Sequence, residues 1–220
     1  MALESTRTLE QLSDECMTRG LSVTPSGKNG KFKKEDYIRA LRADYLVEQY
    51  GEPENVPFPL RFMLTMDCPM LCKRYAAIKK QDVQISLWKN DGKYAAEEKI
   101  DGSRSILIYD AERHEFDFFS RHNSVSDFLP ISYKDTILVH GNYRGDTSFV
   151  LDCEVISTNA NVTTKKTCTS QLNSTSAILS LDPVQSREIQ KNNPLLFVVF
   201  DCLYDGVDIR SLPWKDRHVH

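Results

Sequence analysis

KIDGSRSILIYDAERHEFDFFSRHN, residues 99–123, contains two runs of β-branched and aromatic residues bounded by turn residues, a pattern typical of β-strands. Similar runs recur at 136–141 (TILVHG), 148–157 (SFVLDCEVIS) and 195–206 (LLFVVFDCLYDG), and helix-like sequence interrupts them at 174–190. Strands with inserted helices predict an α+β fold with antiparallel sheets rather than a doubly wound parallel sheet.

Polar residues interrupt these apolar runs at positions where a buried strand would not be expected to have them. Asp152 and Glu154 lie two residues apart, so on a strand both side chains project to the same face. Burying two carboxylates is costly unless a cation or a hydroxyl-bearing ligand meets them. The sequence therefore predicts a ligand pocket over this face, between two sheets.

The composition is that of an ordinary globular chain: of 220 residues, 40% are hydrophobic and 27% are charged, and the formal net charge is −3. Because that charge is slightly negative, nucleic-acid binding would have to come from local basic patches. The sequence shows no signal-peptide pattern and no apolar run of membrane-spanning length. Its six cysteines have neither disulfide nor zinc spacing, so we expect free thiols and an intracellular location, in the cytoplasm or nucleus.

Residues 1–50 predict two short helices joined by a basic loop. Leu9, Leu12 and Cys16 recur at helical spacing, and 33–51 (KKEDYIRALRADYLVEQYG) forms a second amphipathic run. This pattern resembles the SAP-type DNA-binding motif. The resemblance implies that four lysines of the loop and second helix neutralise DNA phosphates: Lys28, Lys31, Lys33 and Lys34. The alternative is a solvated helical hairpin whose lysines serve solubility.

The next stretch, 51–60 (GEPENVPFPL), contains three prolines and cannot continue a helix. We expect it to be a linker. The predicted layout is therefore a helical module at 1–50, a linker at 51–60 and a larger domain at 61–220.

A Lys-x-Asp-Gly-x-Arg pattern resembles motif I of the covalent nucleotidyltransferases, the superfamily of ligases and mRNA capping enzymes; it is formed by Lys99, Asp101, Gly102 and Arg104. Later segments keep the order and rough spacing of that family's motifs: 118–123 (FFSRHN), 151–154 (LDCE) and 195–217. PML at 69–71 matches the segment that precedes motif I in ATP-dependent DNA ligases. Residues 69–217 therefore resemble the adenylation domain of an ATP-dependent DNA ligase.

The resemblance implies a nucleotidyltransferase (ATP-grasp-like) domain of antiparallel sheets with flanking helices. It also implies that Lys99 attacks ATP to form lysyl-AMP, that AMP moves to the 5′-phosphate of a nick, and that the 3′-hydroxyl then displaces it. A lysine amine in water has a pKa of about 10.4, so a nucleophilic lysine needs nearby cations rather than carboxylates. We expect 94–100 to be a strand on which Glu97 shares the face of Lys99 and Glu98 points away; by resemblance Glu97 meets the adenine edge.

The other roles are also carried over by resemblance. Asp101 would orient the loop and, with Glu154, meet Mg²⁺, while Gly102 lets the backbone approach the nucleotide without a Cβ. Arg104 and Arg121 would hold ribose and phosphate, a task that suits the bidentate guanidinium.

Two residues complete the implied nucleotide pocket: Glu154 would accept the ribose 2′-hydroxyl, and Phe200 would stack on the adenine ring. Each candidate also has a structural alternative. In isolation, Lys99 would be a surface ion pair, Arg104 and Arg121 strand-edge charges, and Phe200 a core residue. The ordered motifs favour the site.

Two departures from the family pattern qualify the expected function. Cys153 replaces a usual glycine, and the later lysine motifs and OB-fold domain do not appear before His220. We therefore expect the chain to be the N-terminal portion of a DNA ligase, incomplete at its C-terminal end. The ligase would act as a monomer on nicked duplex DNA in replication, repair or recombination. The portion alone would be weakly active or inactive. The alternatives are an RNA ligase or GTP-dependent capping enzyme, and a non-catalytic DNA-binding relic.

Overall fold

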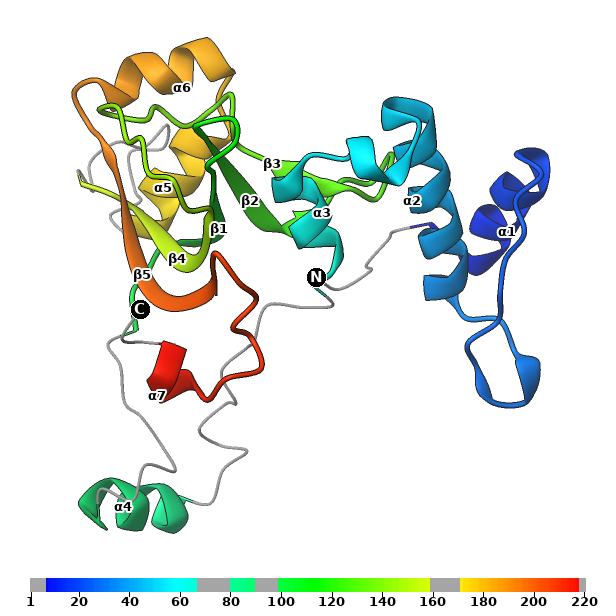
Figure 1. The fold of residues 1–220 in the computed structure, drawn as a ribbon, viewed down its shortest axis with the longest axis horizontal. Coiled ribbons are helices and arrows are strands. Elements are labelled where there is room, and N and C mark those ends of the chain that lie inside the picture. Colours follow the sequence, from blue (N-terminus) through cyan, green and yellow to red (C-terminus); the bar gives the residue numbers. More distant parts are fainter. Residues whose placement is uncertain (1–6, 67–79, 90–98, 159–170, 218–220) are drawn as a thin grey trace.

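The computed structural model describes residues 7–66, 80–89, 99–158 and 171–217, and Figure 1 shows their arrangement. Within these ranges the chain forms seven α-helices and one five-stranded antiparallel sheet, which confirms the predicted α+β class. No helix in these ranges is both long enough and apolar enough to cross a membrane.

Two helices form the predicted N-terminal hairpin: α1 (Leu9–Thr18) and α2 (Lys34–Tyr50), joined by a loop that contains a 3-10 turn, η1 (Lys28–Gly30). The Thr8 hydroxyl accepts the Gln11 N–H and the Gln11 side chain accepts the Thr8 N–H, so α1 begins with a capping box. Apolar residues at helical spacing meet between the helices and enclose one residue of a distant loop; this core contains Leu12, Cys16, Ile38, Leu41 and Phe128.

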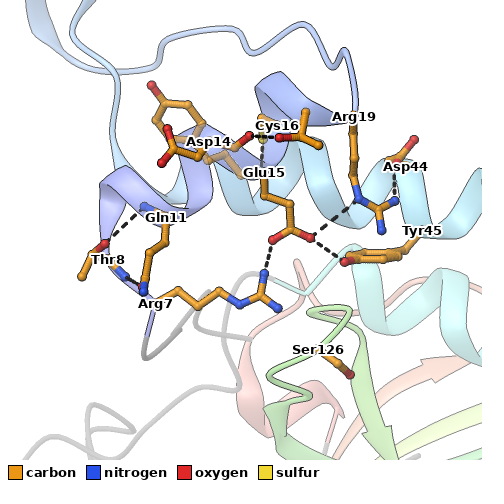
Figure 2. Close-up of polar contacts among 12 residues, drawn as sticks. Arg7, Thr8, Gln11, Asp14, Glu15, Cys16, Arg19, Asp44, Tyr45 and Ser126 are labelled. Carbon is orange, nitrogen blue, oxygen red and sulfur yellow. Dashed lines mark hydrogen bonds and ion pairs between the residues drawn. The ribbon is translucent and has the colours of Figure 1, made fainter.

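A polar network also holds the two helices together, as Figure 2 shows. Glu15 of α1 accepts hydrogen bonds from the Tyr45 hydroxyl, at 2.8 Å, and from the Arg7 guanidinium. Arg19 pairs with Asp44 of α2 at 2.6 Å and lies 3.7 Å from Glu15. Arg7 and Arg19 are thus engaged within the hairpin.

The stretch predicted to be a linker contains a 3-10 turn, η2 (Pro53–Asn55), and the beginning of α3 (Phe58–Leu64). Proline is tolerated in the first turn of a helix because the N–H groups there have no intrahelical partners. Within the stretch, Phe58 packs against the core of the sheet, to which Phe62 and Met63 of the same helix also belong. Part of the stretch is therefore an ordered support for the sheet.

The sheet has the strand order β3-β2-β1-β4-β5, and every neighbouring pair is antiparallel. Its strands are β1 (Ser103–Asp110), β2 (Glu115–Asn123), β3 (Pro130–Ser132), β4 (Phe149–Ser157) and β5 (Leu195–Asp205). β1 lies at the centre of the sheet, where Ile106 faces Phe119 on one side and Asp152 on the other.

Helices and apolar clusters cover both faces of the sheet. Ile106, Ile108 and Leu203 pack with α3 on one face. On the other face Phe118 packs near Leu179, the last residue of α5 (Gln171–Leu179). Figure 1 shows α6 (Pro183–Gln190) beside α5, and the remaining helices are α4 (Lys80–Lys89) and α7 (Trp214–Arg217).

The predicted strand at 136–141 is wrong, because these residues form no strand. Their backbone bonds instead to Gln190 of α6, which accepts the Leu138 N–H at 2.9 Å and donates to the Thr136 carbonyl at 2.8 Å. A side chain from a helix therefore satisfies the groups that a strand ladder would have used. The helix-like sequence at 174–190 also forms two helices, α5 and α6, rather than one.

The expected alternation along 94–100 does not extend to Lys99. β1 begins at Ser103, and Lys99 and Ile100 lie in irregular backbone before it. Glu97, which was expected to share a strand face with Lys99, lies outside the described residues.

Candidate active site

Arg104 and Asp152 form a bidentate pair across β1 and β4. Arg104 Nε donates to Asp152 Oδ1 at 2.8 Å and Arg104 Nη2 donates to Oδ2, while their side chains are only 13% and 4% exposed. Burial raises the pKa of the Asp152 carboxyl, the Arg104 guanidinium opposes that shift, and the neighbouring charge of Asp201 adds to it. This ion pair places a cation and an anion together on one face of the sheet.

Glu154 lies on the same face, two residues further along β4, as the sequence predicted. Its Oε1 accepts the Gly102 N–H at 3.2 Å. Burial raises the pKa of the Glu154 carboxyl, whereas the Gly102 N–H and the charges of Arg104, Lys99 and Arg121 lower it. Three of the predicted site cations therefore lie close enough to Glu154 to act on its charge.

Phe200 joins this cluster from β5. The register between β4 and β5 shifts by one residue there, because Asp152 faces Asp201 whereas Cys153 faces Val199. Such a bulge turns the extra residue away from the normal alternation. The Arg104 guanidinium carbon lies 5.2 Å from the Phe200 ring centroid, within cation–π distance.

The close approach of β4 requires a glycine at position 102. A Cβ at this position would lie 2.3 Å from the Val155 carbonyl oxygen and 2.7 Å from Ile156 Cγ2. Any larger residue would push the loop away from β4 and lengthen the Gly102–Glu154 hydrogen bond. The structure thus adds a packing reason to the expected one.

The remaining candidates lie at the rim or outside the cluster. Asp101 and Lys99 are exposed immediately before β1, and Arg121 is exposed at the end of β2, where its Nε lies 3.1 Å from His122 Nε2. The lysines predicted to bind DNA are in the N-terminal hairpin, with Lys28, Lys31 and Lys33 exposed and Lys34 half-buried. The sheet therefore gathers the nucleotide candidates, and the hairpin carries the DNA candidates separately.

Sequence reasoning assigned no role to a second buried ion pair beside this cluster. Arg217 of α7 donates to Asp201 through Nε at 2.9 Å and Nη2 at 2.7 Å, and the two side chains are 8% and 6% exposed. Asp201 faces Asp152 across β4 and β5. The available signal was an aspartate ending an apolar run, but nothing in the sequence pairs it with an arginine sixteen residues away.

Comparison with protein families identifies the chain. The family of the ATP dependent DNA ligase domain matches residues 69–219, which include the whole sheet and α4 to α7. The chain belongs to this family. No curated protein matches the chain. The match begins after the helical hairpin and α3, and the cluster around Glu154 lies entirely within it.

The ligase domain implies use of ATP, which usually enters such reactions with Mg²⁺. Mg²⁺ is commonly held by one or two carboxylates together with substrate phosphates. Both Asp152 oxygens bond to Arg104, whereas Glu154 bonds to the Gly102 N–H through Oε1. The described residues contain no group of three or more metal-binding side chains. A single carboxylate such as that of Glu154 fits an ion that phosphate oxygens hold in large part.

Proposed function

We propose that this chain carries out the ATP-dependent ligase reaction through Lys99, and that it acts in sealing nicks in duplex DNA. The observation that carries the proposal is that Lys99, Arg104 and Arg121 all lie close enough to the half-buried Glu154 to lower the pKa of its carboxyl, within the ligase-family domain. In this proposal the three cations would meet the negative phosphates of the nucleotide.

The first step forms a bond between Lys99 Nζ and the α-phosphorus of ATP. The bond from that phosphorus to the bridging oxygen breaks, pyrophosphate leaves with the electron pair, and the lysine proton passes to solvent. Asp152 fixes the Arg104 guanidinium, which would hold ribose or phosphate together with the exposed Arg121. Glu154 would accept the ribose 2′-hydroxyl, and Phe200 would stack on adenine.

Glu154 and Asp101 are the residues that would hold Mg²⁺, which when bound supplies positive charge to the phosphates. Asp101 is exposed two residues after Lys99. Glu97 would contact the adenine edge.

In this proposal the N-terminal hairpin binds the DNA substrate. Residues 1–50 would form a SAP-like module whose lysines bind phosphates, 51–60 would connect it, and 61–220 would form the adenylation domain. Two sites on one chain raise the local concentration of DNA near Lys99. The proposed protein is an intracellular monomer.

The test is covalent labelling of the chain with α-labelled ATP or GTP, followed by mass measurement of the intact protein. We expect a weak adduct of one AMP from ATP, in keeping with the low activity expected of this chain alone, and this adduct should be lost in Lys99→Ala and retained in Lys191→Ala, a control lysine that is exposed on the same domain. An adduct that persists in Lys99→Ala would remove the nucleophile assignment. Labelling by GTP alone would favour a capping enzyme, and ATP binding without an adduct would favour the non-catalytic alternative.

A further inference from the structure

The loop at residues 26–33, SGKNGKFK, is the most basic exposed segment of the hairpin. It contains three lysines and no acidic residue, although the chain as a whole has a net charge of −3. Lys28, Lys31 and Lys33 are exposed and form no ion pair with any other described residue. The arginines Arg7 and Arg19 bond to acidic residues inside the hairpin (Figure 2), so these lysines are the cations that the loop offers to a ligand.

A buried aspartate holds both ends of this loop. Asp36 of α2 is 3% exposed, and its Oδ2 accepts the Ser26 N–H at 3.0 Å and the Lys33 N–H at 2.8 Å. The Ser26 side chain and the backbone N–H groups of Lys33 and Ser26 lower the pKa of Asp36 to about 2. The carboxylate therefore stays charged and closes the loop at its base.

The inside of the loop is equally constrained. The Gly27 N–H donates to the Lys31 carbonyl at 2.9 Å, and a Cβ on Gly27 would lie 2.3 Å from that oxygen. Asn29 adopts a left-handed conformation with φ of 59°. Because its backbone is fixed in this way, the loop presents its side chains without first having to become ordered.

Phe32 lies between Lys31 and Lys33 in this loop and is 46% exposed. Its ring centroid lies 5.7 Å from that of Tyr37, at an interplanar angle of 36°. Tyr37 is itself partly buried against the core of the hairpin. Phe32 is therefore an aromatic ring supported from behind, with nearly half of its surface open.

A single exposed phenylalanine is ordinary, and lysines alone bind phosphates of any nucleic acid. The combination is more selective. An aromatic ring between cations is the arrangement by which proteins bind single strands, since the ring stacks on a base while the cations meet the flanking phosphates. In an intact duplex the base faces are covered by their neighbours, so such a ring finds a partner only where a base is unpaired.

We propose that loop 26–33 binds DNA at unpaired bases, with Phe32 stacking on one base and Lys28, Lys31 and Lys33 contacting the phosphates beside it. This inference rests on the proposed function for its choice of DNA as the partner. It narrows the DNA that the loop prefers to bind to breaks that carry unstacked bases, such as frayed nicks and gaps, over continuous duplex.

The test measures binding of the whole chain to a single-stranded oligonucleotide, a gapped duplex and an intact duplex, by fluorescence anisotropy over a series of salt concentrations. We expect Phe32→Ala to weaken binding to the first two DNAs roughly 5- to 150-fold, because base stacking contributes about 1–3 kcal/mol per base. Binding to intact duplex should change little. Phe32→Trp should bind single strands at least as tightly as the unmodified protein.

Two further variants separate stacking from charge and from folding. Lys31→Ala should reduce the salt dependence of single-strand binding by about 0.7 in the log–log slope, whereas Phe32→Ala should leave that slope unchanged. Leu9→Ala is the matched control, because Leu9 is 47% exposed on the same hairpin. It should bind all three DNAs normally.

Three results would overturn the inference: equal affinity of Phe32→Ala and the unmodified protein for single strands, an equal loss on intact duplex, or the same loss in Leu9→Ala. Labelling of Lys99 by ATP, measured without DNA in the same preparations, should be unaffected by Phe32→Ala. A failure of labelling therefore counts against the proposed reaction, and a failure of selective binding counts against the loop.

Discussion

Asp36 in the N-terminal hairpin and Asp152 in the sheet are both only 3% exposed, yet their surroundings shift the pKa of the two carboxyl groups in opposite directions. Backbone and side-chain donors from Ser26 and Lys33 lower the pKa of Asp36 to about 2. Burial raises the pKa of Asp152, and the bidentate Arg104 only partly opposes it. One carboxylate is stabilised by its own loop, and the other depends on a partner side chain.

This difference indicates that Asp36 has a structural role, whereas Asp152 belongs to a candidate ligand-binding site. Donors that belong to the backbone cannot leave, so Asp36 fixes the shape of the basic loop whatever binds there. A charge that is costly to bury and is balanced by a side chain responds to any ligand that brings charge of its own. Such a response is expected where a nucleotide binds.

The largest effect should follow from breaking the Arg104–Asp152 pair. Asp152→Ala leaves the nearly buried guanidinium without its counter-charge, and removal of one partner from a buried pair typically costs about 3–5 kcal/mol. Chemical denaturation measures this free energy of unfolding. Asp135→Ala is the control: the Asp135 side chain is 85% exposed and pairs weakly with Arg187, so it should cost less than about 1 kcal/mol.

A double variant, Arg104→Leu with Asp152→Leu, sharpens this test. Apolar replacement of a whole buried pair is often neutral or stabilising, so much of the lost stability should return. Binding of ATP should nevertheless be lost in the double variant, because the Arg104 cation that lies over Phe200 is gone. If the double variant binds ATP normally, the pair serves folding alone.

The next effect concerns the contact between the two regions, which Phe128 makes. Its ring is fully buried in the core of the hairpin, its carbonyl accepts Arg42 Nε at 2.9 Å, and the Arg7 guanidinium lies 5.3 Å from the ring centroid. Phe128→Ala should cost about 3 kcal/mol through the cavity it leaves. It should also speed proteolytic cleavage between residues 51 and 57.

Phe128→Gly refines the same prediction. Phe128 has a φ of 59°, a strained conformation for a bulky residue that glycine adopts freely. Glycine should therefore destabilise the protein less than alanine does. Equal cleavage rates in all three proteins would show that the hairpin does not depend on this contact.

The sequence predicted the hairpin helices, the shared face of Asp152 and Glu154, and the family. Helical spacing, period-two alternation and motif order are local properties, so they can be found without a structure. The placement of Lys99 in irregular backbone was not predicted, because the alternation of 94–100 suggested a strand that would include Lys99, whereas β1 begins at Ser103.

Contacts between distant residues could not be predicted in the same way. Three contacts join residues that no spacing rule connects: the pair of Arg217 with Asp201, the hydrogen bonds of Gln190 with the 136–138 backbone, and the packing of Phe128 in the hairpin core. The prediction of a strand at 136–141 was wrong for this reason, since the side chain of Gln190 makes the hydrogen bonds that a neighbouring strand would have made. The supporting contacts of the site therefore emerge only from the fold.

The smallest effect is a pH dependence of opposite sign at the two aspartates. The pKa of Asp36 falls from 3.8 to about 2 on folding, so its stabilisation is complete above about pH 4 and is lost as the pH falls towards about 2. The pKa of Asp152 is raised, so its contribution is greatest at low pH and declines as the pH rises through its folded pKa. The free energy of unfolding should be measured across this acid range for Asp36→Asn and for the unmodified protein. Their difference should shrink with falling pH; a constant difference would mean that the charge of Asp36 does not hold the loop.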